Sequence, residues 1–360
     1  MKLTGTSRGP EEPLVALCVP RTASLRDVMA IIDRGGQGIA LVVGDDYRLE
    51  ATMTDGDVRR ALLRGLGLDA TVADVLSNSA KVGQLPLVAT PNTPAGELLR
   101  TMNTAGVRHI PIVDDRYRVV GISLLSELIK EQNPPVEALV MAGGFGKRLN
   151  EFTKDIPKPM LPIHGKPILE IIVDNLRSSG IRHVNFATHY KGNIIRDHFG
   201  DGSGFGVKIN YVREDQPLGT AGALGLMDPT TEPLLVINGD ILTSVNFRAM
   251  LDFHMENSAS MTVAVKEHEF ELPFGVVELQ GECVTGICEK PKMRRYVNAG
   301  IYLINPSVRA IVPRKRSYDM PDLITALLNR RERVVGFPIA EDWVDIGHPA
   351  DYRKAAGIDA

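Results

Sequence analysis

An apolar stretch that runs directly into a glycine-rich loop constrains this sequence more than any other feature. Residues 138–141 are apolar, Arg148 follows the loop, and Lys158 lies in a Pro-Lys-Pro motif after a polar interval. The loop glycines are Gly143, Gly144 and Gly146. A buried strand that feeds such a loop is typical of nucleotide sites, because glycines let backbone N–H groups close on a phosphate. The glycines alone also fit an ordinary strand-to-helix turn, but the two cations favour a polyphosphate ligand.

A second apolar stretch, residues 234–237, ends at Asn238-Gly239 and presents Asp240 where a strand is expected to finish. Open α/β sheets bind ligands at the carboxyl ends of their strands, and an aspartate there can hold Mg²⁺ together with phosphate oxygens. Aspartate is also a common turn former, although the apolar run before it favours a ligand. Asp345 lies between apolar neighbours on another expected strand, where a charged group needs a partner or a metal.

The remaining periodicity from residue 137 onward predicts an α/β fold. Apolar residues from Ile168 to Leu176 have helical spacing, and Gly180 is expected to end that helix. Residues 184–187 and 207–212 are expected to be strands. Alternating strands and helices imply a mostly parallel sheet with helices on both faces.

These motifs, in this order over about residues 137 to 356, closely resemble the sugar-1-phosphate nucleotidyltransferases. The resemblance implies a Rossmann-like, mostly parallel sheet of the nucleotidyltransferase (glycosyltransferase A-like) type. It also implies an enzyme that joins a nucleoside triphosphate to a sugar 1-phosphate and releases pyrophosphate, with Mg²⁺ as cofactor. Two residues depart from the family pattern, because Lys147 stands where threonine is usual and Glu151 lies in place of a Pro-Leu-Thr segment.

The resemblance assigns a role to each matching residue of this chain. Arg148 and Lys158 would stabilise pyrophosphate, Lys290 would hold the sugar phosphate, and Asp240 with Asp345 would hold Mg²⁺. The nucleotide would be bound by Ala142, Gly143, Gly144, Gly146, Gly219, Thr220, Asn238 and Gly239. The sugar would be bound by Gly275, Glu289 and Asn298. Thr220 has a plain alternative as a helix cap, and Lys290 as a solvated surface lysine.

Residues 14–131 contain a repeat, because a shift of 70 positions places Tyr47-Arg48-Leu49 over Tyr117-Arg118-Val119. Each copy predicts a helix, a strand, a turn, a strand and a helix. Two such copies, residues 14–70 and 83–131, resemble a pair of cystathionine-β-synthase-type (CBS) repeats, an α+β regulatory module that binds purine nucleotides. We expect an N-terminal tail over residues 1–13, a linker over 132–136 and a catalytic domain over 137–360.

In CBS repeats a Thr and an Asp after the second strand commonly contact the ligand, and Thr54 and Asp57 match them in the first copy. Both residues fit equally well as caps of the following helix. Leu124 and Glu127 occupy the equivalent places in the second copy, so one of the two clefts is expected to be degraded. CBS pairs commonly associate, which implies a homo-oligomer.

The substrate pair is the least constrained part of the prediction. A CBS pair joined to a compact transferase is most similar to the glucosamine-1-phosphate guanylyltransferases of legionaminic acid biosynthesis, which favours GTP and glucosamine 1-phosphate. Mannose- or heptose-1-phosphate guanylyl transfer, or uridylyl, cytidylyl or thymidylyl transfer, are the alternatives. A nucleotide-sensing regulatory protein without activity is an alternative from another class.

The composition limits the kinds of partner, metal site and cellular location that are expected. With a net charge of −3, nothing indicates nucleic acid or an acidic membrane as a partner. The three cysteines, without a Cys-x-x-Cys pair, indicate neither a disulfide framework nor a zinc site. No uninterrupted apolar run is long enough to cross a bilayer, so a cytoplasmic protein is expected.

Overall fold

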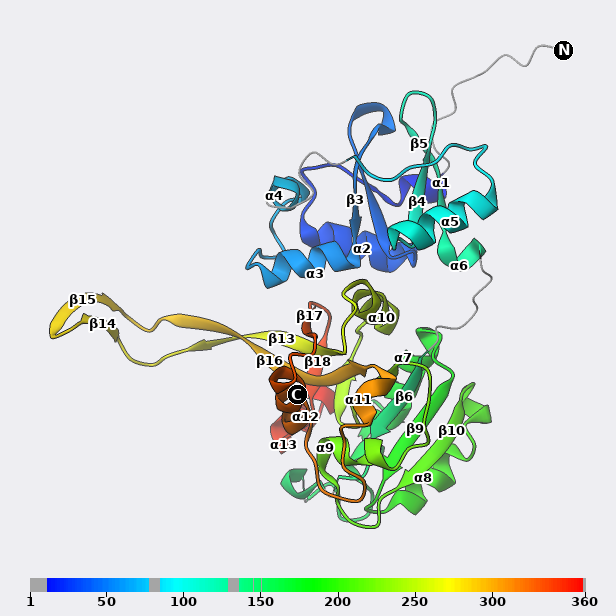
Figure 1. Cartoon of the computed structure of the whole chain (residues 1–360). Helices are drawn as coiled ribbons and strands as arrows, with labels where there is room; N and C mark the ends of the chain where they lie inside the picture. Colours follow the sequence, from blue (N-terminus) through cyan, green and yellow to red (C-terminus); the bar gives the residue numbers. More distant parts are fainter. Residues whose placement is uncertain (1–11, 78–84, 129–135, 145, 150, 359–360) are drawn as a thin grey trace. The chain divides into compact units, whose positions relative to one another are not determined.

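The computed structural model describes residues 12–77, 85–128, 136–144, 146–149 and 151–358. The chain forms two compact units, Met1–Gln132 and Asn133–Ala360 (Figure 1). The expected tail over residues 1–13 and linker over 132–136 lie almost entirely outside the described residues.

The N-terminal unit is built from two similar halves. The elements of the first half are α1 (Glu12–Val15), β1 (Cys18–Val19), α2 (Leu25–Gly35), β2 (Ile39–Val43), β3 (Leu49–Thr54), α3 (Asp55–Leu63) and α4 (Val72–Ser77). Those of the second half are α5 (Ala95–Ala105), β4 (His109–Val113), β5 (Val119–Leu124) and α6 (Leu125–Leu128).

The repeat seen in the sequence is present in the strands of both halves. β2 pairs antiparallel with β3, and β4 pairs antiparallel with β5. The register shifts after Val42 in the first hairpin and after Ile112 in the second, which are equivalent positions under the 70-residue shift. β1 adds to the first hairpin as a parallel neighbour of β2. Because β-bulges are specific features of a fold, the shared bulge supports a common origin of the halves.

The C-terminal unit contains a seven-stranded sheet with the strand order β10-β9-β6-β11-β16-β13-β17. Its strands are β6 (Glu137–Met141), β9 (His183–Thr188), β10 (Lys208–Arg213), β11 (Leu234–Asn238), β13 (Met261–Glu271), β16 (Lys292–Ile304) and β17 (Val334–Ile339). β10, β9, β6 and β11 are parallel, as the alternating pattern predicts. β16 is antiparallel to both of its neighbours, and nothing in the sequence pattern predicted this.

Helices cover both faces of this sheet. They are α7 (Ile168–Ser178), α8 (Gly192–Phe199), α9 (Gly219–Gly222), α10 (Phe247–Glu256), α11 (Pro306–Arg309), α12 (Met320–Asn329) and α13 (Pro349–Ala356). Ala138 and Val140 of β6 pack with α7, α8 and α10, whereas Leu139 packs with α12 and the small residues around α9. A strand buried on both faces explains the continuous apolar run before the glycine loop.

Three two-stranded sheets complete the unit. Their strands are β7 (Pro162–Ile163) with β8 (Lys166–Pro167), β12 (Ile241–Thr243) with β18 (Trp343–Asp345), and β14 (Val276–Gln280) with β15 (Cys283–Cys288). β13 and β16 continue beyond the seven-stranded sheet as a narrow ribbon that ends in β14 and β15 (Figure 1). We call residues 266–297 the arm. Within the described residues, no helix combines the length and apolar character that crossing a membrane requires.

Candidate active site

The glycine loop follows β6 and is shaped by close contacts that exclude side chains. Gly146 has a φ of +62°, and a Cβ there would lie 2.9 Å from the Thr153 side chain. A Cβ on Gly143 would lie 3.0 Å from Glu214 Oε2. Gly144 is exposed, and a Cβ placed on it would have no neighbour within 4 Å among the described residues. The loop therefore needs glycine at Gly146 for its backbone and at Gly143 for packing, and it is open at Gly144.

A cavity of about 390 Å³ lies beneath this loop. Its lining residues are Gly144, Gly146, Arg148, Leu149, Lys158, Asp240, Asp345 and Gly347. The structure thus gathers both predicted pyrophosphate cations, both predicted metal carboxylates and two loop glycines around one space.

Backbone contacts fix the two carboxylates. Asp240 follows β11 through Gly239, whose N–H donates to Met141 O at 3.0 Å. A Cβ on Gly239 would lie 2.7 Å from that oxygen, so glycine lets the ends of β6 and β11 approach. Asp345 lies opposite Ile241 where β18 pairs with β12, and the N–H of Ile346 donates to Asp240 O at 3.0 Å.

Charges in the cavity balance one another. Lys158 Nζ lies 2.5 Å from Asp240 Oδ2. Burial raises the pKa of the Asp345 carboxyl above its ordinary value, and the negative charge of Asp240 raises it further, while Lys158 and Arg148 lower it. Two nearby carboxylates that destabilise each other's charge favour a cation between them.

The donor set fits Mg²⁺. No cluster of three or more His, Cys, Asp or Glu side chains suited to a metal occurs within the described ranges. Mg²⁺ is typically held by one or two carboxylates together with substrate phosphates and water, which Asp240 and Asp345 could provide.

Glu214 is a buried carboxyl next to the glycine loop that sequence reasoning did not single out. Its side chain lies beneath Gly143 and is buried, and its Oε1 has no hydrogen-bond partner among the described residues. Desolvation raises the pKa of this carboxyl to about 7, although nearby His189 lowers it. In the sequence, Glu214 starts a polar loop and has no apolar neighbours to indicate burial. Only the packing of the end of β10 against the glycine loop makes it a buried carboxyl.

The predicted nucleobase loop is held in place by the start of α12. Gly219 has a φ of +77°, and a Cβ there would lie 2.5 Å from Asp319 Oδ1. The Thr220 N–H donates to Asp319 Oδ1 at 2.9 Å, and the Met320 N–H donates to Thr220 Oγ1 at 2.8 Å. Thr220 therefore helps to cap a neighbouring helix, which accounts for its hydroxyl structurally.

The residues predicted to bind the sugar and its phosphate lie in two separate places in the structure. Asn298 lies on β16 close to Asn238, since the Gly300 N–H donates to Asn298 Oδ1 and a Cβ on Gly300 would be 2.7 Å from Asn238 Nδ2. Gly275, Glu289 and Lys290 are exposed on the arm and do not line the cavity. Their sugar and phosphate roles remain predictions.

Thr54 and Asp57, the predicted CBS ligand residues, form a capping box at the start of α3. The Asp57 N–H donates to Thr54 Oγ1 at 3.3 Å, and the Thr54 N–H donates to Asp57 Oδ2 at 3.0 Å. Asp57 also pairs with Arg60 at 2.8 Å. The capping role is thus present, and a ligand role remains a prediction.

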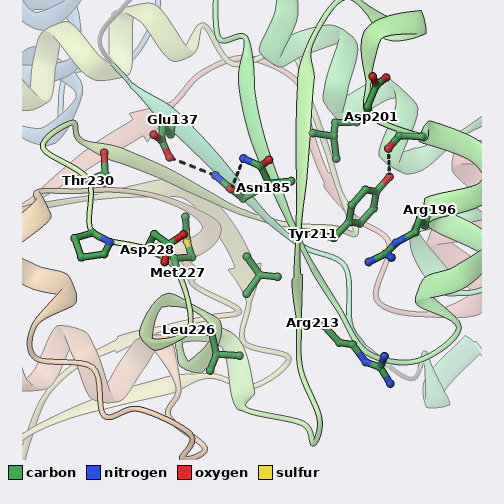
Figure 2. Close-up of a pocket in the computed structure, with 15 residues that line it drawn as sticks. Glu137, Asn185, Arg196, Asp201, Tyr211, Arg213, Leu226, Met227, Asp228 and Thr230 are labelled. Carbon is green, nitrogen blue, oxygen red and sulfur yellow. Dashed lines mark hydrogen bonds between the residues drawn. The ribbon is translucent and has the colours of Figure 1, made fainter.

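A second hollow lies along the edge strand β10 (Figure 2). Its polar groups largely engage one another, since Asn185 donates to Glu137 at 3.4 Å and the Tyr211 hydroxyl donates to Gly200 O at 2.7 Å. The Arg196 guanidinium lies 4.8 Å from the Tyr211 ring centroid. None of the predicted site residues lines this hollow.

A mostly parallel sheet with a glycine loop, two cations and two carboxylates at one cavity is the arrangement of a nucleotide-binding α/β domain. The sequence model of the nucleotidyl transferase family matches residues 137–360, and the chain belongs to that family. A CBS domain model matches residues 69–133.

Individual relatives agree with this assignment. The chain is 34% identical over 228 residues to a mannose-1-phosphate guanylyltransferase of Mycobacterium tuberculosis, covering 61% of this chain and 64% of that protein. It is 36% identical over 226 residues to a D-glycero-alpha-D-manno-heptose 1-phosphate guanylyltransferase of Aneurinibacillus thermoaerophilus, covering 61% of this chain and 96% of that protein. The chain therefore spans less than two thirds of the first relative but nearly all of the second.

Among the solved structures that share the fold is one from Bacillus anthracis. It is provisionally described as a glucose-1-phosphate thymidylyltransferase and contains sucrose. It matches with a TM-score of 0.50 at 25% identity and covers 62% of this chain and 94% of that one. The predicted fold class, an α/β nucleotidyltransferase sheet preceded by a CBS domain, is confirmed.

Proposed function

We propose that this protein transfers a guanylyl group from GTP to a sugar 1-phosphate, giving a nucleotide-sugar and pyrophosphate. The observation that carries the proposal is the single cavity lined by Arg148, Lys158, Asp240 and Asp345 beneath the glycine loop. Relatives named as mannose- and heptose-1-phosphate guanylyltransferases support the reaction class.

The reaction needs positioning more than covalent chemistry. A sugar-phosphate oxygen forms a bond to the α-phosphorus of GTP, and the bond between that phosphorus and the bridging oxygen to the β-phosphate breaks. Pyrophosphate leaves with the electron pair. Because the nucleophile is already anionic, the protein chiefly has to align two anions and neutralise their charge. Arg148 and Lys158 would do so at the departing pyrophosphate, and Lys290 at the incoming sugar phosphate.

Asp240 and Asp345 would hold Mg²⁺ when it is bound. The metal would supply positive charge to the phosphates, which reduces their mutual repulsion. Lys158 forms an ion pair with Asp240. A triphosphate in the cavity offers Lys158 a more highly charged partner, and that leaves Asp240 available to the metal.

Glu214 supports guanine as the base. Guanine carries two adjacent donors, N1–H and the N2 amino group, and an ionised carboxylate is an acceptor on both oxygens. Uracil, thymine and cytosine do not present that pair of donors. A buried carboxylate with an unpartnered oxygen next to the glycine loop is therefore suited to guanine.

The sugar is the finer part of the proposal. The CBS pair favours glucosamine 1-phosphate, whereas the relatives act by name on mannose or heptose 1-phosphate. Pyrophosphate release should be measured with Mg²⁺ while crossing GTP, UTP, CTP, dTTP and ATP with these sugar phosphates. A preference for GTP with glucosamine 1-phosphate is expected. Folded protein that is silent with every pair would favour the regulatory alternative.

The N-terminal unit would regulate this activity by binding a purine nucleotide, and the protein would act as a homo-oligomer. Titrating ATP, ADP, GTP and GMP into the full chain by calorimetry tests the regulatory site. Nucleotide binding should first be measured for Asp240→Asn, in which the catalytic cavity is disabled. Adding Asp57→Asn to that variant should then remove the binding that remains. Binding unaffected by Asp57→Asn would leave Thr54 and Asp57 with capping alone.

A further inference from the structure

One face of the arm is apolar and uncovered. In β14 and β15, Val277 pairs with Ile287 and Leu279 pairs with Val284, so these four side chains share one face. Their exposed fractions are 46%, 73%, 65% and 66%, respectively. A two-stranded ribbon is only marginally stable by itself in water, and a row of exposed apolar side chains marks an interaction surface.

The arm extends away from the catalytic unit of its own chain, so that unit does not cover the apolar face. β13 and β16 stay paired from Met261 opposite Ile304 to Glu271 opposite Lys292, which keeps the ribbon extended (Figure 1). β16 begins at Lys292, and Glu289 lies just before it, whereas Asn298 lies at the base of the arm. At about 3.3 Å per residue, the six positions from Lys292 to Asn298 span about 20 Å along the strand.

Exposed apolar residues also lie near the cavity. Val344 precedes Asp345 and is 40% exposed, and Val297 at the base of the arm is 37% exposed. The Trp343 Nε1–H donates to Ala299 O at 2.9 Å, which places these two segments together. The chain thus has two exposed apolar surfaces, one on the arm and one near the cavity. The extended arm keeps them apart within one chain.

We propose that the arm docks on the catalytic unit of a second copy of this chain, so that each copy completes the sugar-phosphate side of its partner's cavity. Because both surfaces lie on one chain, a twofold pair satisfies both of them reciprocally. Most side chains of residues 266–297 are exposed. The arm therefore offers enough surface residues for a standard interface, which uses roughly 20–30 residues on each side.

The end of the arm carries polar groups suited to a ligand. Glu289 shares the apolar face, since a Cβ on Gly275 would lie 2.8 Å from Glu289 Oε2 and 3.7 Å from Ile287. Lys290 follows with a φ of +46°, a conformation that non-glycine residues rarely adopt outside functional sites and tight turns. The docked arm delivers this carboxylate and this ammonium group together.

The first experiment measures association by sedimentation. Wild type should be a dimer, and the double variant Leu279→Asp/Ile287→Asp should be a folded monomer with kcat/KM lowered at least tenfold. Leu328→Asp is the matched control, because Leu328 is 57% exposed elsewhere on the same unit. An unchanged mass for the double variant would overturn the proposal.

The second experiment rests on the proposed function and asks which chain supplies the arm. Lys290→Ala and Asp240→Asn are co-expressed with different tags, and the mixed dimer is isolated. If arms are exchanged, one of its two cavities combines an intact body with an intact arm, so activity returns to about half that of wild type. Activity no greater than that of the parent variants would show that each arm serves its own chain. An inactive wild type would refute the proposed function instead and leave the sedimentation result standing.

Discussion

Replacing Glu214 by Gln should weaken the use of GTP and remove a specific pH dependence. The substitution keeps the shape of the side chain but removes its charge, and its amide would face guanine's donors with one acceptor oxygen only. A base contact of this bidentate kind contributes about 1–3 kcal/mol, so kcat/KM for GTP should fall by a factor of about 5 to 150. The turnover of bound GTP should change less, because Glu214 does not line the cavity that holds Asp240 and Asp345.

The pH dependence follows from the raised pKa of Glu214, which is about 7. A carboxyl with a raised pKa is protonated below that value and ionised above it. The ionised fraction therefore rises from about a tenth at pH 6 to about nine tenths at pH 8, and kcat/KM for GTP should rise about tenfold with it. Pyrophosphate release at pH 6, 7 and 8 measures this for wild type and Glu214→Gln.

The neighbouring residue provides the control for this prediction. Asp215→Asn removes the same charge from an exposed position and should retain both the wild-type kcat/KM and its pH profile. Protonation of GTP itself affects all three proteins equally and cancels in their ratios. If Glu214→Gln kept the wild-type slope between pH 6 and 8, the assignment of this carboxyl to guanine would be refuted.

Three further substitutions test the cavity and the two units. Asp240→Asn should lower kcat by about 10²–10³ without loss of folding, whereas Asp342→Asn, on the exposed loop nearby, should stay near wild type in the same pyrophosphate assay. Gly146→Ala should lower the free energy of unfolding by about 1–2 kcal/mol through its positive φ, while Gly144→Ala should leave urea denaturation unchanged. Asp55→Asn should destabilise the N-terminal unit by about 3 kcal/mol, because it leaves the fully buried arginine of α3 without the carboxylate it contacts at 2.7 Å. A Tm within one degree of wild type would contradict that estimate.

Much of the cavity could be predicted because its residues directly follow strands that can be recognised from apolar runs in the sequence. The apolar run before the glycine loop and the run before Asp240 each indicate a buried strand, and parallel strands bring their carboxyl ends to one edge of the sheet. The 70-residue repeat was likewise visible because both halves place their strands at equivalent positions.

The remainder depends on packing between segments that are distant in the sequence. Glu214 is buried only because β10 and the glycine loop meet, and a polar loop sequence carries no sign of that contact. The arm was missed because its residues alternate like any surface hairpin, and periodicity does not specify how far a ribbon extends. The antiparallel direction of β16 depends on the same long hairpin, since it returns the chain beside β13.

The pairing of β12 with β18 has a consequence for how this protein can diversify. The Ile346 N–H donates to Asp240 O and Asp345 pairs with Ile241, so backbone hydrogen bonds hold the segments that carry the two carboxylates side by side. The long segment between them, which includes the arm, does not set their spacing. Lengthening such a segment twofold costs only about 0.6 kcal/mol of closure entropy. The arm, which is proposed to bind the sugar phosphate, can therefore change in length and sequence during evolution. The spacing of the two carboxylates would stay the same.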